Sequence, residues 1–215
     1  MTNETMTNDT ALNETETNKT VTNDPTTSKT QNLLALIKTL APVNQADFFD
    51  LGILTFTDDV RAMCEQNTCG RFGRAWNCPP VCGSVAELEA VCKSFERGIL
   101  INTVTKIEDS FDWEGMMAGA RDLYELLLEV DRTAEKLGVK HRRVFGSGGC
   151  NGCEECCYPE IPCRHPDKVF TPIEACGINV MQLAKDAGFK YINGQNTVTY
   201  FGMVLLGDEP PRDSE

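Results

Sequence analysis

The spacing of the cysteines restricts what this chain can fold into more than any other feature. Nine of its eleven cysteines fall in two short segments. Glycines and prolines lie between them and disfavour regular helices and strands there. We therefore expect two loops whose thiols gather around bound metal. The first cysteine segment holds Cys64, Cys69, Cys78 and Cys82, and the second holds Cys150, Cys153, Cys156, Cys157 and Cys163.

The compartment decides between disulfides and metal ligands. No window of the sequence approaches the roughly 18 apolar residues of a membrane span, and the first 30 residues lack the apolar centre of a signal peptide. We therefore expect a cytoplasmic protein without a membrane span. In the reducing cytoplasm a dense set of cysteines more often binds metal than forms disulfides, and their odd number also argues against complete pairing.

The charge balance restricts the partners. The chain has 20 Lys and Arg against 32 Asp and Glu, a formal net charge of −12 at pH 7. Such a surface repels phosphate backbones and anionic lipids, so we expect no nucleic-acid partner. It would favour docking of a basic partner protein.

The 215 residues predict one domain between two tails. Residues 1–30 repeat Thr, Asn and acidic residues with almost no large apolar side chains, which predicts a disordered tail. Residues 208–215 are mostly charged and include two prolines, which predicts a shorter flexible tail. Residues 31–207 should form the cysteine-rich metal-binding domain, since apolar residues make up 41% of the chain.

Four segments combine an apolar stripe at helical spacing with residues that cap helices. Ser84 and Glu87 form a capping box, and Asp112 can cap the longest stripe. Residues 171–174 supply a Thr cap, a first-turn Pro and a capping-box Glu for the last helix. The predicted helices span residues 33–41, 84–95, 112–138 and 171–188.

Strand-forming residues occupy the segments on either side of the long predicted helix. Residues 98–106 and 140–145 flank it, which is the order of a parallel crossover unit. Tyr191-Ile192, an Asn-Gly turn and the run 197–206 predict a hairpin. We therefore expect an α/β fold: a single compact domain with a mixed β-sheet, flanking helices and two cysteine-rich metal-binding loops.

The second cysteine segment has the more diagnostic spacing. Cys150, Cys153 and Cys156 are three residues apart, with Cys163 further on. Ferredoxins wrap 4Fe-4S clusters with loops of this kind. Structural zinc usually takes two Cys-x-x-Cys pairs a dozen or more residues apart, and neither segment has that pattern. The second segment thus favours iron–sulfur over zinc, whereas the first alone leaves both open.

The remaining candidates have weaker claims. Cys92 and Cys176 fall on apolar helical stripes, where free cysteine behaves as a small hydrophobe. Cys157 directly follows Cys156, and neighbours rarely ligate one ion together, so it is either a spare or a redox-active thiol. His165 is a less favoured ligand than the cysteines. Four arginines near the cysteines either offset the charge of a bound cluster or are simply solvated: Arg61, Arg71, Arg74 and Arg164.

These features resemble a cysteine-rich family of predicted metal-binding proteins from anaerobic bacteria and archaea, domain of unknown function 2284. The resemblance implies metal or iron–sulfur binding through the cysteines, and no particular reaction. Cys82 and Cys157 do not belong to the family's shared set, which leaves the fourth ligand of the first segment open. The similarity covers most of residues 53–206 and rests on Val60-Arg61, Cys64, Cys69, Gly73, Cys78-Pro79-Pro80, Cys150, Cys153, Cys156, Tyr158-Pro159, Pro162-Cys163-Arg164, Pro166, Glu174-Ala175, Gly177 and the run 197–202.

Three functional hypotheses follow. The leading one is an iron–sulfur protein with two 4Fe-4S clusters that exchanges electrons with a partner redox enzyme, one cluster on Cys64, Cys69, Cys78 and Cys82 and the other on Cys150, Cys153, Cys156 and Cys163. The second is an enzyme in which Cys64, Cys69 and Cys78 alone hold a cluster, leaving one iron open as a Lewis acid or sulfur-handling centre. The third is a zinc-stabilised interaction module. Signatures of serine hydrolases, zinc proteases and phosphate-binding loops are missing, so no catalytic residue is assigned.

Overall fold

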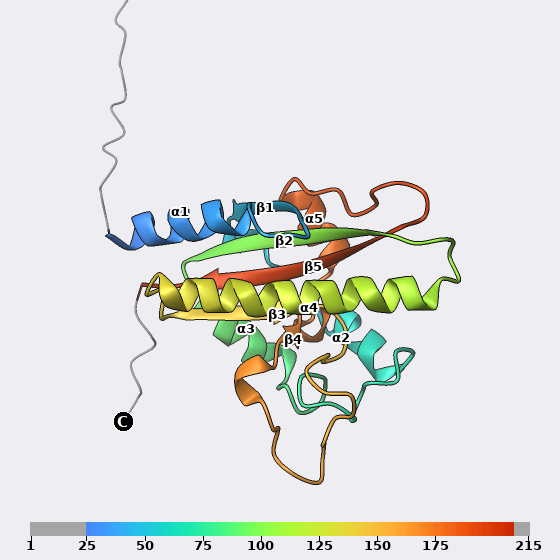
Figure 1. Cartoon of the computed structure of the whole chain (residues 1–215). Helices are drawn as coiled ribbons and strands as arrows, with labels where there is room; N and C mark the ends of the chain where they lie inside the picture. Colours follow the sequence, from blue (N-terminus) through green and yellow to red (C-terminus); the bar gives the residue numbers. More distant parts are fainter. Residues whose placement is uncertain (1–24, 209–215) are drawn as a thin grey trace, which may run out of the picture.

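Five strands form one mixed sheet with helices on both faces (Figure 1), in a computed structural model that describes residues 25–208. The strand order across the sheet is β1-β2-β5-β3-β4. The elements are α1 (Pro25–Ile37), β1 (Val43–Phe49), η1 (Leu51–Ile53), α2 (Asp58–Glu65), α3 (Val85–Lys93), β2 (Arg97–Lys106), α4 (Trp113–Lys136), β3 (Arg142–Gly146), η2 (Pro166–Lys168), β4 (Thr171–Pro172), η3 (Glu174–Cys176), α5 (Val180–Asp186) and β5 (Thr197–Leu206), where η marks a 3-10 turn.

The strand β5 organises the sheet. It pairs antiparallel with β2 along ten residues and antiparallel with β3 on its other side. β2 and β3 therefore run in the same direction, as the predicted crossover through α4 requires, but β5 lies between them. Only β3 and β4 form a parallel pair, with Phe145 opposite Thr171.

Each face of the sheet buries its own apolar cluster, because successive side chains of a strand point to opposite faces. Val204 and Leu206 face α1 and α4, together with Ile99 of β2. Met203 and Leu205 face the other way, toward α3, η3 and α5. Most side chains of β2 and β5 are therefore buried, because helices cover both faces of the sheet at these strands.

Several sequence predictions are confirmed. The fold is α/β with a mixed sheet in one domain, and the long helix begins after Asp112, whose Oδ1 accepts a hydrogen bond from the Gly115 amide at 2.8 Å. Both hydrogen bonds of the Ser84–Glu87 capping box are present. β2, β3 and β5 lie within a residue or two of the predicted ranges.

Other predictions are wrong. Residues 171–174 do not cap a helix: Thr171 and Pro172 pair with the end of β3, and α5 begins after Asn179, whose side chain accepts from the Gln182 amide. The pairing with a neighbouring strand overrides the local capping pattern. Tyr191-Ile192 forms no strand, because both sides of β5 are already paired with β2 and β3.

The ends of the domain differ in part from the predicted boundaries. α1 starts at Pro25, inside the range predicted as a tail, and Thr30 on it is buried and accepts a hydrogen bond from Arg97. Most of the predicted tails, residues 1–24 and 209–215, lie outside the described residues. Within residues 25–208, no helix combines the length and apolar character that crossing a bilayer requires.

Candidate metal centre

The first cysteine segment starts on a helix, which differs from the predicted loop. Cys64 lies in the last turn of α2, and Cys69, Cys78 and Cys82 follow in the irregular stretch that leads to α3. α2 is held against η3 by the hydrogen bond from the Thr57 amide to the Gly177 carbonyl, at 2.9 Å. The segment therefore meets the residues that follow β4.

Three cysteines of the first segment share one cavity. Cys64, Cys69 and Cys78 line a space of about 250 Å³, and Glu174 of η3 lies on the same wall. Ser147 and Gly148, which lead from β3 into the second cysteine segment, close its other side. The cavity thus lies where the two cysteine segments and η3 come together.

Cys82 lies close to these cysteines but in a different environment. It is not among the residues that line the cavity, and it packs instead against the apolar cluster of α3, η3 and α5. Arg61, buried on α2, donates to the carbonyl oxygens of Ala175 and Gly83, and its positive charge opposes the increase that burial causes in the pKa of the Cys82 thiol. Arg61 is therefore a structural cation within the site. The sequence alone left open whether this arginine is solvated or offsets the charge of a bound cluster.

Burial governs the acidity of the first segment in the metal-free protein. It raises the pKa of the Cys78 thiol to about 12, and the neighbouring Cys69, Cys82 and Cys64 add to this effect. Burial likewise raises the pKa of Cys64, while Arg61 opposes the increase. The thiols are thus close enough to repel one another as thiolates, and a bound cation would relieve that repulsion.

The second cysteine segment extends beyond β3. Burial raises the pKa of the Cys150 thiol, with further contributions from Cys156, Cys163 and Cys153, so these four side chains are neighbours. Cys153, Cys156 and Cys157 line an open hollow of about 790 Å³ that His165 also borders. The Cys157 thiol donates to the carbonyl oxygen of Pro162 at 3.4 Å.

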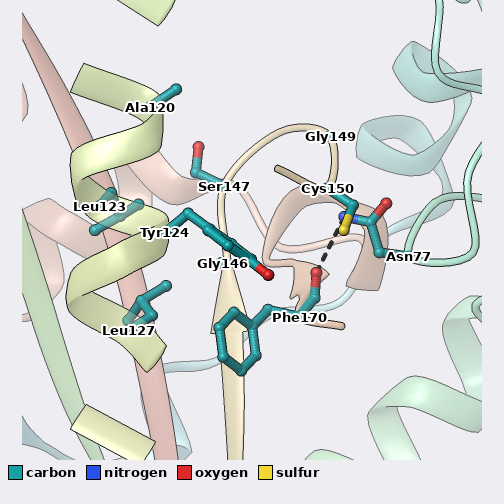
Figure 2. Close-up of a pocket in the computed structure, with 10 residues that line it drawn as sticks. All are labelled: Asn77, Ala120, Leu123, Tyr124, Leu127, Gly146, Ser147, Gly149, Cys150 and Phe170. Carbon is teal, nitrogen blue, oxygen red and sulfur yellow. Dashed lines mark hydrogen bonds between the residues drawn. The ribbon is translucent and has the colours of Figure 1, made fainter. Parts of the chain in front are cut away.

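The two cysteine segments are in direct contact (Figure 1). The side chain of Asn77, which precedes Cys78, donates to the carbonyl oxygens of Phe170 at 3.1 Å and Gly148 at 3.3 Å. Figure 2 shows Asn77 and Cys150 together across a narrow crevice from α4. Whatever binds at one segment is therefore adjacent to the other.

The second segment is fitted tightly against α4. The Tyr124 hydroxyl donates to the carbonyl oxygen of Lys168 at 3.1 Å. A Cβ on Gly152 would lie 2.7 Å from the Tyr124 Oη and 3.4 Å from the Cys150 Sγ. Only glycine fits between this hydroxyl and this sulfur without a shift.

Between the segments lies a buried donor that has no acceptor among the described residues. The buried Nε1 of Trp76 has no hydrogen-bond partner, and its ring meets the ring of Tyr158 edge-on with centroids 5.0 Å apart. Trp76 belongs to the first segment and Tyr158 to the second. A buried N–H without a protein partner is uncommon, and a water molecule or a bound ligand atom would satisfy it.

The cysteines surround spaces and do not form a ready site for one ion. Among the described residues, no three or more His, Cys, Asp or Glu side chains are grouped as a single metal ion would need. Tetrahedral zinc with Zn–S bonds of about 2.3 Å would require sulfurs within about 4 Å of one another. The thiols are soft donors, which suit either zinc or an iron–sulfur cluster.

Two residues of the site were missed or misread in the sequence. Asn77 carried no recognisable signal, because its role depends on contacts with residues far along the chain. Glu174 was read as a helix cap although it lies on the cavity wall; an isolated acid in an otherwise apolar run was the available signal. Cys92 and Cys176 are buried in the core, as predicted.

The comparison with protein families agrees with this geometry. A family model described as predicted metal-binding protein (DUF2284) matches residues 48–206, which include both cysteine segments and the cavity. The chain belongs to the DUF2284 family. No curated protein and no solved structure matches it. As a DUF2284 protein it is a predicted metal-binding protein, and its cysteine segments are the candidate ligands.

Proposed function

We propose that this DUF2284 protein is a cytoplasmic iron–sulfur protein that holds two 4Fe-4S clusters and exchanges single electrons with a partner redox enzyme. Cys150, Cys153, Cys156 and Cys163 would hold one cluster. Cys64, Cys69 and Cys78 would hold the other, with Cys82 as the fourth ligand expected from the sequence. When bound, such clusters supply one-electron chemistry at potentials set by their hydrogen bonds and their burial.

The observation that carries the proposal is the contact between two cysteine segments far apart in the sequence. The buried side chain of Asn77 joins them through hydrogen bonds, and the orphan Trp76 N–H lies at the same junction. Two electron-carrying groups at these segments would be neighbours. The acidic chain, with a net charge of −12, would favour a basic partner.

The cavity favours a second candidate, an enzyme with an open iron. Three cysteines line it, which leaves one coordination position of a four-iron cluster facing free space. That position would act as a Lewis acid or sulfur-handling centre. Loss of the first cluster in Cys78→Ala and its retention in Cys82→Ala would support this candidate.

The deciding experiment is metal analysis of strictly anaerobically purified protein. The proposal predicts about eight irons and eight sulfides per chain, because each of the two clusters contains four irons and four sulfides. Reduction with dithionite should change the electron paramagnetic resonance signals of the clusters reversibly. Protein without iron and sulfide, or with clusters that cannot be reduced reversibly, would contradict it. One or two zinc ions without sulfide would instead indicate a zinc-stabilised interaction module.

A further inference from the structure

Glu174 has an unusual environment for a carboxylate. It is half-buried in η3, between the fully buried Ile173 and Ala175, and it lies on the wall of the cavity with Cys64, Cys69 and Cys78. None of the ion pairs among the described residues involves it. A carboxylate withdrawn from water normally needs a cation or several hydrogen-bond donors.

The nearby cation is already engaged. Arg61 donates to the carbonyl of Ala175, the residue after Glu174, and to the carbonyl of Gly83. Arg61 thus binds the backbone around Glu174 without pairing with its carboxylate. A metal cation bound in the cavity would give the Glu174 carboxylate the positively charged partner that Arg61 does not provide.

Cys82 faces the opposite situation. Its side chain packs against the apolar cluster of α3, η3 and α5. The cavity wall includes Glu174 and not Cys82. Of the two side chains that could complete the first site, only the carboxylate faces the space that the other three ligands share.

We propose that Glu174, and not Cys82, is the fourth ligand of the first metal site, beside Cys64, Cys69 and Cys78. This inference rests on the proposed function, since it assigns a residue to the cluster proposed there. A hard carboxylate binds iron less tenaciously than a soft thiolate does. The first site would therefore have one exchangeable position that opens onto the cavity, whereas the second site would be closed by four thiolates.

The test compares iron content and resonance spectra in full-length variants prepared anaerobically. Wild-type protein should hold about eight irons, and Glu174→Ala about seven, because one iron of a four-iron cluster loses its protein ligand. The oxidised Glu174→Ala protein should show the signal of a three-iron cluster. Glu174→Cys should restore the iron and remove that signal, whereas Cys82→Ala should resemble wild type. Glu96→Gln, an exposed carboxylate on the loop before β2, is the matched control.

The outcomes separate the ligand assignment from the proposed function. The assignment is overturned if Cys82→Ala loses iron while Glu174→Ala keeps the wild-type content. It is also overturned if both variants lose the same amount of iron, or if neither loses any. Glu174→Gln, nearly equal in shape, and circular dichroism of the metal-free proteins exclude misfolding as the cause. Wild-type protein without iron or sulfide overturns the proposed function instead. In that case, the variant that loses zinc identifies the fourth ligand.

Discussion

The Nδ2 of Asn77 lies 3.3 Å from the carbonyl oxygen of Gly148. This hydrogen bond joins the two cysteine segments, because Asn77 immediately precedes Cys78 and Gly148 stands two residues before Cys150. The same amide also donates to the carbonyl of Phe170 at 3.1 Å. This buried side chain, together with the Trp76–Tyr158 contact, therefore holds the two candidate metal loops next to each other.

Replacement of Asn77 with alanine should destabilise the protein and loosen both segments. Two carbonyls would lose their donor inside the protein, where an unsatisfied group costs about 1–3 kcal/mol. Urea unfolding of the metal-free protein should show this loss, and iron content should fall at both sites. Asn193→Ala is the control: its amide also donates two hydrogen bonds, but on an exposed loop. A cost no larger than that of the control would show that Asn77 does not join the segments.

The fold could be predicted from the sequence where local signals and tertiary contacts agree. Asp112 caps α4, and an amphipathic stripe follows it, so this helix was evident. β1 was missed, because it is an edge strand whose polar residues, such as Asn44 and Asp47, hide its pairing with β2. A strand that is defined mainly by its pairing with a neighbour need not show an alternating apolar pattern in its own sequence.

The sequence offered the candidate ligands of the site and not their arrangement. Cysteine spacing identified both segments, but the junction depends on Asn77 and on residues about 70 to 90 positions away. Glu174 was misread, because Thr, Pro and Glu in that order also match a helix cap. The pairing of β4 with β3 makes this segment a short strand and a turn instead of a helix cap. That pairing is a long-range contact, which the local sequence does not reveal.

Replacement of Gly152 with alanine should lower the iron content of the second site. The new Cβ would lie 2.7 Å from the Tyr124 hydroxyl, so the hydroxyl or the loop must shift, and the Cys150 sulfur lies only 3.4 Å away on the same loop. Tyr124→Phe removes the hydroxyl, and the double variant should recover iron that Gly152→Ala loses. Iron and sulfide analysis of the three variants checks this. No recovery in the double variant would mean that the close approach to Tyr124 is not the cause.

Replacement of Cys176 with alanine should cost stability without loss of iron. Cys176 is fully buried, its thiol donates to the carbonyl of Pro172, and it contacts Cys92. The loss of a small buried group should cost about 1–2 kcal/mol. Cys156→Ala should show the reverse, with less iron and little change in the unfolding of metal-free protein. Loss of iron in Cys176→Ala would instead make this core cysteine part of a metal site.

The stability of the metal-free protein should fall above about pH 10, in part through Tyr200. Its hydroxyl donates to the carbonyl of Met116 at 2.6 Å, and burial raises the pKa of its phenol above 10.0. The unfolded chain then releases this proton at a lower pH than the folded protein, so its contribution to stability is complete below pH 10 and is lost as pH rises further.

Tyr200→Phe provides the measurement. At pH 8 the variant should be less stable by about 1 kcal/mol, the net value of one hydrogen bond. Between pH 8 and about pH 10.5 the wild-type protein should lose more stability in urea unfolding than Tyr200→Phe does. Other buried groups titrate in the same range and are common to both proteins. Equal losses would mean that Tyr200 has the same pKa in both states.

Arg61 should set both the stability of the first site and the reduction potential of a cluster bound there. Its guanidinium bridges two carbonyls of different segments, a geometry that lysine cannot reproduce. Arg61→Gln should cost about 2 kcal/mol or more, as expected for hydrogen bonds from a charged group. Because a buried positive charge favours the reduced, more negative cluster, its removal should lower the potential.

A redox titration followed by paramagnetic resonance would separate these two effects. The potential of the first cluster should become more negative in Arg61→Gln, while that of the second should change less. Arg74→Gln is the matched control, since Arg74 lies in the same segment but is exposed. A shift of equal size in the control would mean that the total charge of the segment sets the potential. An unchanged potential with reduced stability would make Arg61 a purely structural cation.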